Sequence, residues 1–250
     1  MPGVKKIFSI LSNPSSLRNH LSNLVVGFLS PKRYWDLAQS ATWNYGKAPG
    51  KRISDLFPGI QNIDIDIRRG LDRSPSTSVN MHELAVLCAL AKFTEAKNIL
   101  EIGTFRGNTT LNLAVNTPQS TNIKTVDLPD NWSGEMEISE PRSKTRGKIG
   151  IQFRGTGYTK RITQIYGDST KIDWKRMGSP FDFVFIDGCH LHDFVVADTE
   201  NAFENVKKGG VILWHDYGMI EDVSRAVDRF GKNHDIHRIH STRLALTVVE

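Results

Sequence analysis

From residue 98 onward, short apolar runs alternate with stretches whose apolar positions recur at helical spacing. The short runs are rich in β-branched and aromatic residues and predict strands at 98–102, 122–126, 162–166, 181–186 and 211–214. The intervening stretches predict helices at about 108–116, 169–177, 193–206 and 220–230. Strands and helices that alternate in this way indicate a parallel sheet with helices on both faces.

The last fourteen residues follow a different pattern. Two short apolar segments, 237–240 and 244–249, are separated by only three residues, which leaves no room for a crossover helix. These two strands must therefore pair antiparallel. The predicted fold class is α/β: a doubly wound, mostly parallel, seven-stranded Rossmann-like sheet that finishes in an antiparallel β-hairpin.

A helix at 81–93 precedes the first strand and is apolar on nearly every side, so we expect it to be buried. Asn80 and Glu83 stand at the spacing of a capping box at its start. Cys88 within the helix is expected to be a packed thiol. We predict one domain over residues 78–250 that begins with this helix.

Residues 1–77 are expected to form an N-terminal extension of helices and loops, which acts as a cap or a dimerisation segment. An amphipathic helix is predicted around residues 17–28, and it could pack on the core, contact a second copy or lie on a membrane surface. A homo-oligomer is therefore one expectation. The stretch 129–160 is long for a connection and rich in glycine and charge, which predicts a mobile flap near the site.

The composition, 39% hydrophobic and 24% charged, is typical of a soluble globular protein. No apolar stretch is long enough to span a bilayer, and Ser12–Ser16 interrupts the first apolar run too early for a secretory signal. Two cysteines make neither a disulfide framework nor a four-cysteine zinc site, so we expect a cytoplasmic protein.

The net charge of +5 is concentrated in two basic regions. Residues 1–75 hold eleven Lys/Arg against five Asp/Glu, and a second basic cluster occupies 142–161. Such regions attract anionic partners, including nucleic acid, phosphorylated substrates or lipid headgroups. No nucleic-acid-binding motif accompanies the charge, so a solvated basic face is the preferred interpretation and nucleic acid is not the expected partner.

A glycine-containing turn connects the strand at 98–102 to the next helix. Gly103 and Gly107 flank Thr104 in this turn, where the ligand can approach the backbone and the helix start offers N–H groups. The dinucleotide fingerprint G-x-G-x-x-G is absent because residue 105 is phenylalanine. Glu101 would repel a phosphate and attract a cationic amino-acid group. An ordinary strand-to-helix turn with two glycines is the alternative.

Acidic residues stand at or just past the ends of all five parallel strands, the edge where ligands of such sheets bind. Asp127 after the second strand could accept both hydroxyls of a ribose. Asp168 and Ser169 after the third could face an adenine amino group, although Asp168 could equally cap a helix. Asp187 follows the fourth strand, and His215-Asp216 follow the fifth.

The spacing E-x-G-x-x-x-G over 101–107 resembles the first motif of class I S-adenosylmethionine (SAM)-dependent methyltransferases. A longer pattern over 181–198 and 206–217, FIDG-x-H…GGV-x-x-WHDY in outline, resembles the small-molecule O-methyltransferases of the macrocin and cephalosporin-tailoring type. The match extends over roughly residues 78–249.

This resemblance implies that SAM is the cofactor and that residues 78–250 are the methyltransferase domain. The SAM-binding residues would be Glu101, Gly103, Thr104, Gly107, Asp127, Asp168 and Ser169. Asp187 would be a metal ligand and His190 the general base, with His215 and Asp216 as further candidate ligands for Mg²⁺ or Mn²⁺. Catechol-type relatives carry Asp-Asn where this chain has His215-Asp216, so the third ligand stays open.

The sequence therefore predicts an enzyme that transfers a methyl group from SAM to a hydroxyl of a small molecule or sugar. Oxygen is the expected acceptor because the Asn-Pro-Pro-Tyr type of motif is absent after residue 186. A histidine base would make the hydroxyl nucleophilic. His190 and His192 could also be plain polar loop residues. The rivals are an RNA methyltransferase and a SAM-binding protein without catalysis.

Overall fold

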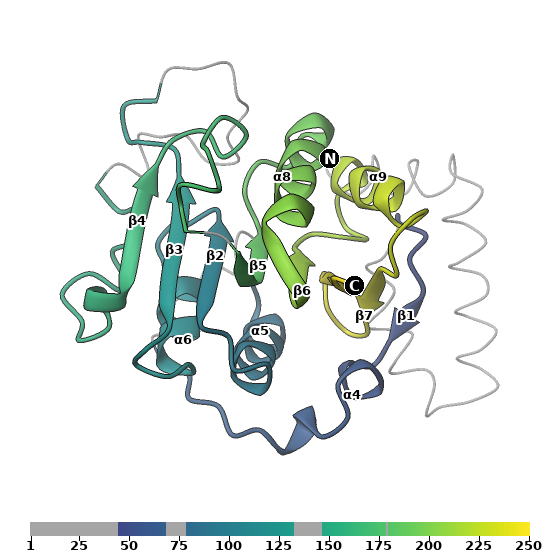
Figure 1. Cartoon of the computed structure of the whole chain (residues 1–250), viewed down its shortest axis with the longest axis horizontal. Helices are drawn as coiled ribbons and strands as arrows, with labels where there is room; N and C mark the ends of the chain where they lie inside the picture. Colours follow the sequence, from purple (N-terminus) through teal and green to yellow (C-terminus); the bar gives the residue numbers. More distant parts are fainter. Residues whose placement is uncertain (1–44, 69–78, 133–146, 179) are drawn as a thin grey trace, which may run out of the picture.

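The computed structural model describes residues 45–68, 79–132, 147–178 and 180–250, and within them it shows one eight-stranded sheet (Figure 1). The strands are β1 Gly50–Lys51, β2 Asn98–Ile102, β3 Asn122–Asp127, β4 Ile162–Tyr166, β5 Phe181–Ile186, β6 Val206–Trp214, β7 His237–Ile239 and β8 Ala245–Val248. Their order is β1-β7-β8-β6-β5-β2-β3-β4, and only β8 runs antiparallel to its neighbours. The predicted fold class is confirmed, with β1 as an additional edge strand.

Within the described residues, five α-helices and two 3₁₀ helices accompany the sheet. They are α4 Ile53–Leu56, α5 Met81–Phe93, α6 Asn108–Val115, α8 His192–Asn205 and α9 Glu221–Phe230, with η1 Ile60–Asn62 and η2 Thr159–Arg161. The longest has 14 residues, and no helix in the described part of the chain is long and apolar enough to cross a membrane.

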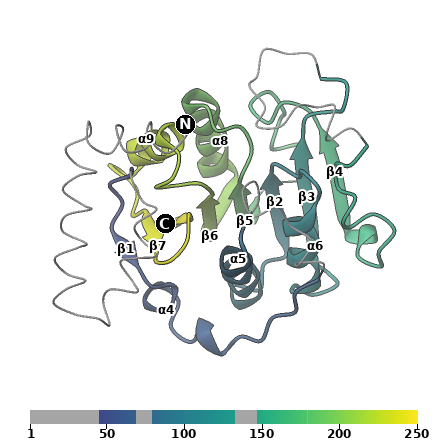
Figure 2. The same cartoon turned by 180° about the vertical axis from the view of Figure 1, so that it is seen from behind.

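The central strands are buried on both faces, as the continuous apolar runs in the sequence require. In register across β2, β5 and β6, Ile99, Phe183 and Val211 pack on the side of α5 and α6. The next residues along, including Leu100 and Val184, pack on the side of α8 and α9. The two helical layers are seen from opposite sides in Figures 1 and 2.

The helix predicted at 169–177 is wrong: this segment is a series of turns. Its polar side chains hydrogen-bond to nearby backbone, which competes with helix formation. Asp168 accepts from the N–H of Thr170 at 3.1 Å, and Asp173 accepts from the N–H of Lys175 at 3.0 Å. The indole of Trp174 donates to the carbonyl of Ser169 at 2.9 Å.

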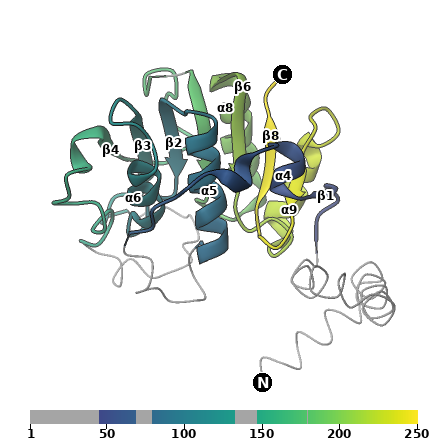
Figure 3. The same ribbon diagram turned by 90° about the horizontal axis from the view of Figure 1, so that it is seen from below.

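Residues 45–68 form a strap that runs from the sheet edge at β1, past α4 and across the α5 side to α6 (Figure 3). Phe57 and Ile60 of the strap are buried in the core. At its other end, the side chain of Asn112 both accepts from the N–H of Arg68 at 2.7 Å and donates to its carbonyl at 3.0 Å. The predicted helix at 17–28 and the boundary at 77/78 lie outside the described residues.

The glycine turn at 103–107 is covered by the later part of the stretch predicted as a flap. Backbone N–H groups of Gly150 and Gln152 donate to the carbonyls of Phe105 and Arg106, at 2.8 and 2.9 Å. Phe153 is buried against Gly107, where any side chain on the glycine would collide with its ring. The mobility of this stretch stays a prediction, and residues 133–146 lie outside the described part.

Beneath the same turn, a buried carboxyl joins β2, β3 and α6. Glu101 on β2 is fully buried and accepts hydrogen bonds from the hydroxyls of Thr110 on α6 and Thr125 on β3. Burial raises the pKa of Glu101 to about 8, against the two threonine hydrogen bonds that lower it. The carboxyl is therefore largely protonated at neutral pH.

This raised pKa predicts a specific pH dependence of stability. The unfolded chain loses the Glu101 proton near pH 4.5, whereas the folded protein keeps it up to about pH 8. The contribution of Glu101 to the free energy of unfolding should therefore be complete below pH 4.5 and be lost as the pH rises through 8. The loss reaches about 1.4 kcal/mol per pH unit at most.

Glu101→Gln keeps an acceptor for the two threonines but cannot ionise. Its free energy of unfolding, measured by urea denaturation at several pH values, should fall less between about pH 5 and about pH 8 than that of the wild type. Equal slopes for the two proteins would show that Glu101 ionises normally in the fold.

Candidate active site

The site lies where β5 and β6 end, because their parallel register brings consecutive residues of both strands to one edge. Ile186 pairs with Trp214, so Asp187 and His215 follow on adjacent strands. The N–H of His215 donates to the carbonyl of Ile186 at 3.0 Å, which continues the ladder past the strand ends. The sequence prediction that these residues share one edge is confirmed.

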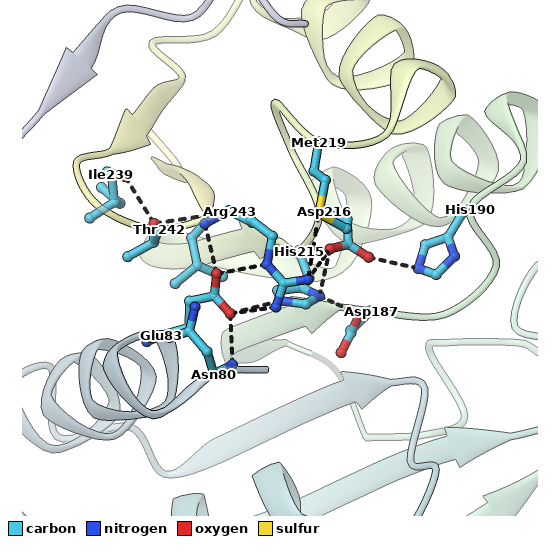
Figure 4. A network of polar contacts seen from close by, with 11 residues as sticks. Asn80, Glu83, Asp187, His190, His215, Asp216, Met219, Ile239, Thr242 and Arg243 are labelled. Carbon is cyan, nitrogen blue, oxygen red and sulfur yellow. Dashed lines mark hydrogen bonds and ion pairs between the residues drawn. The ribbon is translucent and has the colours of Figure 1, made fainter. Parts of the chain in front are cut away.

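His215 is 4% exposed, and its two ring nitrogens face two carboxylates (Figure 4). Nδ1 lies 2.9 Å from Oδ1 of Asp187, and Nε2 lies 3.1 Å from Oε2 of Glu83. Burial alone would lower the pKa of His215, but Asp187, Glu83 and Asp216 raise it to about 10. The imidazole is therefore a cation with both nitrogens donating.

Glu83, at the start of α5, is fully buried and is the acceptor for several donors. It closes the predicted capping box with Asn80, whose N–H donates to Oε2 at 2.8 Å. Arg243 donates to it three times: from its N–H at 2.8 Å, from Nε at 3.0 Å and from Nη2 at 2.9 Å. Burial would raise the pKa of Glu83, and the donors from His215 and Arg243 lower it well below its usual range.

Arg243 lies in the turn between β7 and β8 and connects Glu83 to the end of β6. Its Nη1 donates to Oδ1 of Asp216 at 2.8 Å. Asp216 has φ +57°, a left-handed conformation that aspartate adopts more readily than most residues. A strained backbone at this position is typical of functional sites.

His190 faces the same acids from the loop between β5 and α8. Its Nε2 is buried and lies 3.2 Å from Oδ2 of Asp216, without the alignment of a hydrogen bond. Burial lowers the pKa of His190, and the Asp216 and Asp187 carboxylates raise it above its usual value. Donor atoms of Asp187, His190 and Asp216 all lie within 4.8 Å of one another, a set that could hold a metal ion.

The glycine turn lies directly against this cluster. Gly103 has φ +98°, and a Cβ placed on it would lie 2.0 Å from the carbonyl oxygen of Asp187. The N–H of Asp187 in turn donates to the carbonyl of Ile102 at 2.8 Å. Glycine is therefore needed at 103 because two loops pack backbone to backbone, in addition to any approach of a ligand.

Three of the predicted cofactor residues lie at or beneath the glycine turn and make different contacts there. Asp127 lies at the end of β3, where Oδ2 accepts from the N–H of Phe105 at 2.7 Å and fixes the turn. Thr104 bonds the hydroxyl of Thr125 at 2.6 Å. The Glu101 carboxyl lies beneath the turn, bonded to the two threonines.

Asp168 and Ser169 follow β4 and are engaged locally. Asp168 accepts from Thr170 and pairs with Lys171 at 3.2 Å, within a series of turns that offers no helix for it to cap. Ser169 hydrogen-bonds to Asp198 on α8, whose pKa burial raises to about 7. The adenine contacts assigned to this pair stay predictions.

Sequence reasoning missed Glu83 and Arg243 as parts of the site. The sequence pattern points to Glu83 only as part of the cap of α5, and no motif contains Arg243. One signal was present: a glutamate in a helix that is apolar nearly all round must be buried, and a buried carboxylate requires cationic partners.

Comparison with known proteins finds similarity to methyltransferases. Residues 100–217 match a family model described as a methyltransferase domain. A catechol O-methyltransferase of Mycobacterium tuberculosis is 26% identical over 139 residues, which is 56% of either chain, so this chain spans just over half the length of that relative.

Two solved structures share the fold. An O-methyltransferase of Bacillus cereus, in complex with S-adenosylhomocysteine (SAH), is 21% identical with a TM-score of 0.53 over 70% of this chain and 84% of its own. The O-methyltransferase TomG of Streptomyces achromogenes, involved in tomaymycin synthesis and in complex with SAM, is 17% identical with a TM-score of 0.55 over 80% and 97%. The fold is therefore that of the class I SAM-dependent methyltransferases, and residues 100–217 are the part that resembles the methyltransferase family model.

Proposed function

We propose that this protein is an O-methyltransferase that transfers the methyl group of SAM to a hydroxyl of a small molecule or sugar, with assistance from a divalent cation. One observation carries the proposal: Asp187, His190 and Asp216 converge within 4.8 Å beside the glycine turn. The catechol O-methyltransferase name of the mycobacterial relative supports oxygen as the acceptor atom. The resemblance of residues 181–217 to the macrocin type supports a small-molecule acceptor.

The turn at 103–107 and Asp127 form the donor half of the proposed site. Asp127 stands at the carboxyl end of β3, where a carboxylate can accept the two ribose hydroxyls of SAM. Its hydrogen bond to Phe105 keeps the turn in place at the same time. Gly103 brings this half against Asp187, so donor and acceptor can be held together, as an in-line displacement requires.

His190 and the two aspartates form the acceptor half. We assign to the imidazole of His190, whose Nε2 faces Asp216, the proton that the acceptor hydroxyl loses as its oxygen forms a bond to the methyl carbon and the sulfur–methyl bond breaks. Asp187 and Asp216 present carboxylate oxygens, the ligand type that Mg²⁺ and Mn²⁺ prefer, so the residues present fit such an ion. A bound cation would lower the pKa of the acceptor hydroxyl.

His215 was predicted as a metal ligand, and no observation tests that role directly. Both of its nitrogens face carboxylates, so the ring lies between Glu83 and Asp187, outside the donor set of Asp187, His190 and Asp216. We propose that His215 orients the carboxylate of Asp187, whereas His190 lies beside both Asp187 and Asp216.

The proposal predicts that the protein binds SAH in calorimetric titration, whereas NAD gives no signal. Asp127→Ala should weaken SAH binding roughly 10- to 100-fold, because it removes an anionic acceptor and releases the turn. Asp173→Ala, which changes an exposed aspartate, is the matched control and should bind as the wild type does. Unchanged affinity of the Asp127 variant would remove that residue from the cofactor site.

Asp187→Asn should weaken the binding of Mn²⁺, followed by calorimetry or by the electron paramagnetic resonance signal of the free ion. An amide replaces the charged ligand, and we expect a loss of at least about 10-fold in affinity. Asp193→Asn tests an exposed carboxylate six residues away and should leave Mn²⁺ binding unchanged. Full Mn²⁺ affinity in the Asp187 variant would exclude it as a ligand.

His190→Ala should leave the affinities for SAH and Mn²⁺ unchanged and slow methyl transfer by roughly 100- to 10,000-fold. Transfer is measured as SAH formed from SAM in the presence of catechol and a panel of other hydroxyl compounds. His192→Ala is the control, because that ring pairs with the neighbouring Asp193 at 2.8 Å. A loss of Mn²⁺ binding in His190→Ala would instead make His190 a ligand.

A further inference from the structure

We propose that Glu83 is a positioning residue of the active site, which fixes the carboxylates of Asp187 and Asp216 through His215 and Arg243. The inference rests on the proposed function in one respect, since it takes these two carboxylates as the ones that hold the divalent cation. Glu83 lies more than one hundred residues away in the sequence and belongs to α5, outside the two site loops.

The contacts of Glu83 divide into two arms (Figure 4). The first arm runs from Oε2 to Nε2 of His215 at 3.1 Å, and from Nδ1 of the same ring to Oδ1 of Asp187 at 2.9 Å. The second runs from Glu83 to the guanidinium of Arg243, and from Nη1 of that group to Oδ1 of Asp216 at 2.8 Å. In these two arms each acid is held through its Oδ1, and the group that contacts this oxygen is one that Glu83 fixes.

The rings and planes in these arms limit where the acids can lie. An imidazole has two nitrogens at a fixed angle, and a guanidinium has its donors in a rigid fork. Glu83 contacts one side of the imidazole and one side of the guanidinium, so the opposite sides of the two groups are directed at the acids at the strand ends. His215 is buried and Arg243 is mostly so, which limits the movement of both side chains.

Charge gives Glu83 a second effect on the same acids. Glu83 faces Nε2 of His215 and accepts from Nε and Nη2 of Arg243, so that Nδ1 of the ring lies toward Asp187 and Nη1 of the guanidinium lies toward Asp216. Its carboxylate also adds a negative charge close to the two acids, which favours a divalent cation beside them.

A purely structural role is the alternative, since Glu83 also closes the cap of α5 and buries an ion pair with Arg243. The two roles differ in one measurable quantity. A structural residue changes thermal stability alone, whereas a positioning residue also changes the affinity of the acids for a cation in the folded protein.

The test is Mn²⁺ titration of the full chain in the presence of SAH, below the melting temperature of each variant. Glu83→Gln should bind Mn²⁺ about 10- to 100-fold more weakly, which is the usual effect of removing a partner of a ligand-holding group. It should bind SAH as the wild type does, because Asp127 and the glycine turn are unchanged. Glu83→Asp keeps the charge and should recover part of the Mn²⁺ affinity.

Two controls separate positioning from general destabilisation. Asp182→Asn makes the same acid-to-amide change at the opposite end of β5, where Asp182 accepts from the N–H groups of Lys97 and Asn98 at 2.8 and 2.6 Å. Asn80→Ala removes the other half of the α5 cap, since Asn80 Oδ1 accepts from the N–H of Glu83 at 2.9 Å. Both should lower the melting temperature and leave Mn²⁺ affinity unchanged.

The proposal is overturned if Glu83→Gln melts at a lower temperature but binds Mn²⁺ with wild-type affinity. If Glu83→Gln does not fold, Arg243→Lys is measured in its place, because it removes the guanidinium that contacts both Glu83 and Asp216. Wild-type Mn²⁺ affinity in Arg243→Lys would likewise overturn the proposal. A wild-type protein that binds SAH but does not bind Mn²⁺ would overturn this inference and the metal part of the proposed function. A wild-type protein that does not bind SAH would overturn the proposed function itself.

Discussion

The structure depends on compensating charge at the ends of β5 and β6. Glu83, His215 and Asp216 are nearly or fully buried there, with Asp187 and Arg243 beside them. Replacing such a cluster with apolar residues is often neutral or stabilising in other proteins, so stability alone gives no reason to retain it. A set of charges that costs desolvation free energy and surrounds two strand-end acids is better explained by chemistry performed at those acids.

Backbone packing connects this cluster to the proposed cofactor site. Gly103 in the turn and the carbonyl of Asp187 approach so closely that no side chain fits between them. The later flap segment holds the same turn from the other side through Gly150 and Gln152. Movement of the turn would therefore displace Asp187. In the proposed function, the distance between the methyl donor and the acceptor base is then determined by the fold rather than by flexible side chains.

The sequence predicted most of the fold because local pattern and tertiary structure agree. Strands at 98–102, 162–166 and 181–186 and the helix at 81–93 have the predicted bounds. The helix at 169–177 failed because short polar side chains bond to their own backbone, which periodicity does not detect. The acids at the strand ends were predictable from topology, but Glu83 and Arg243 reach the site through tertiary contacts that spacing along the chain cannot reveal.

Residues on either side of the family match, 100–217, contribute contacts to the acids at the strand ends. The family match, 100–217, contains Asp187, His190, His215 and Asp216 but neither Glu83 nor Arg243. Glu83 comes from the helix before the first central strand, and Arg243 from the turn of the closing hairpin. Because β8 pairs antiparallel with β6, that turn returns to the end of β6 and places Arg243 beside Asp216. The hairpin therefore does more than cover a sheet edge: it supplies the cation that holds one acid of the site.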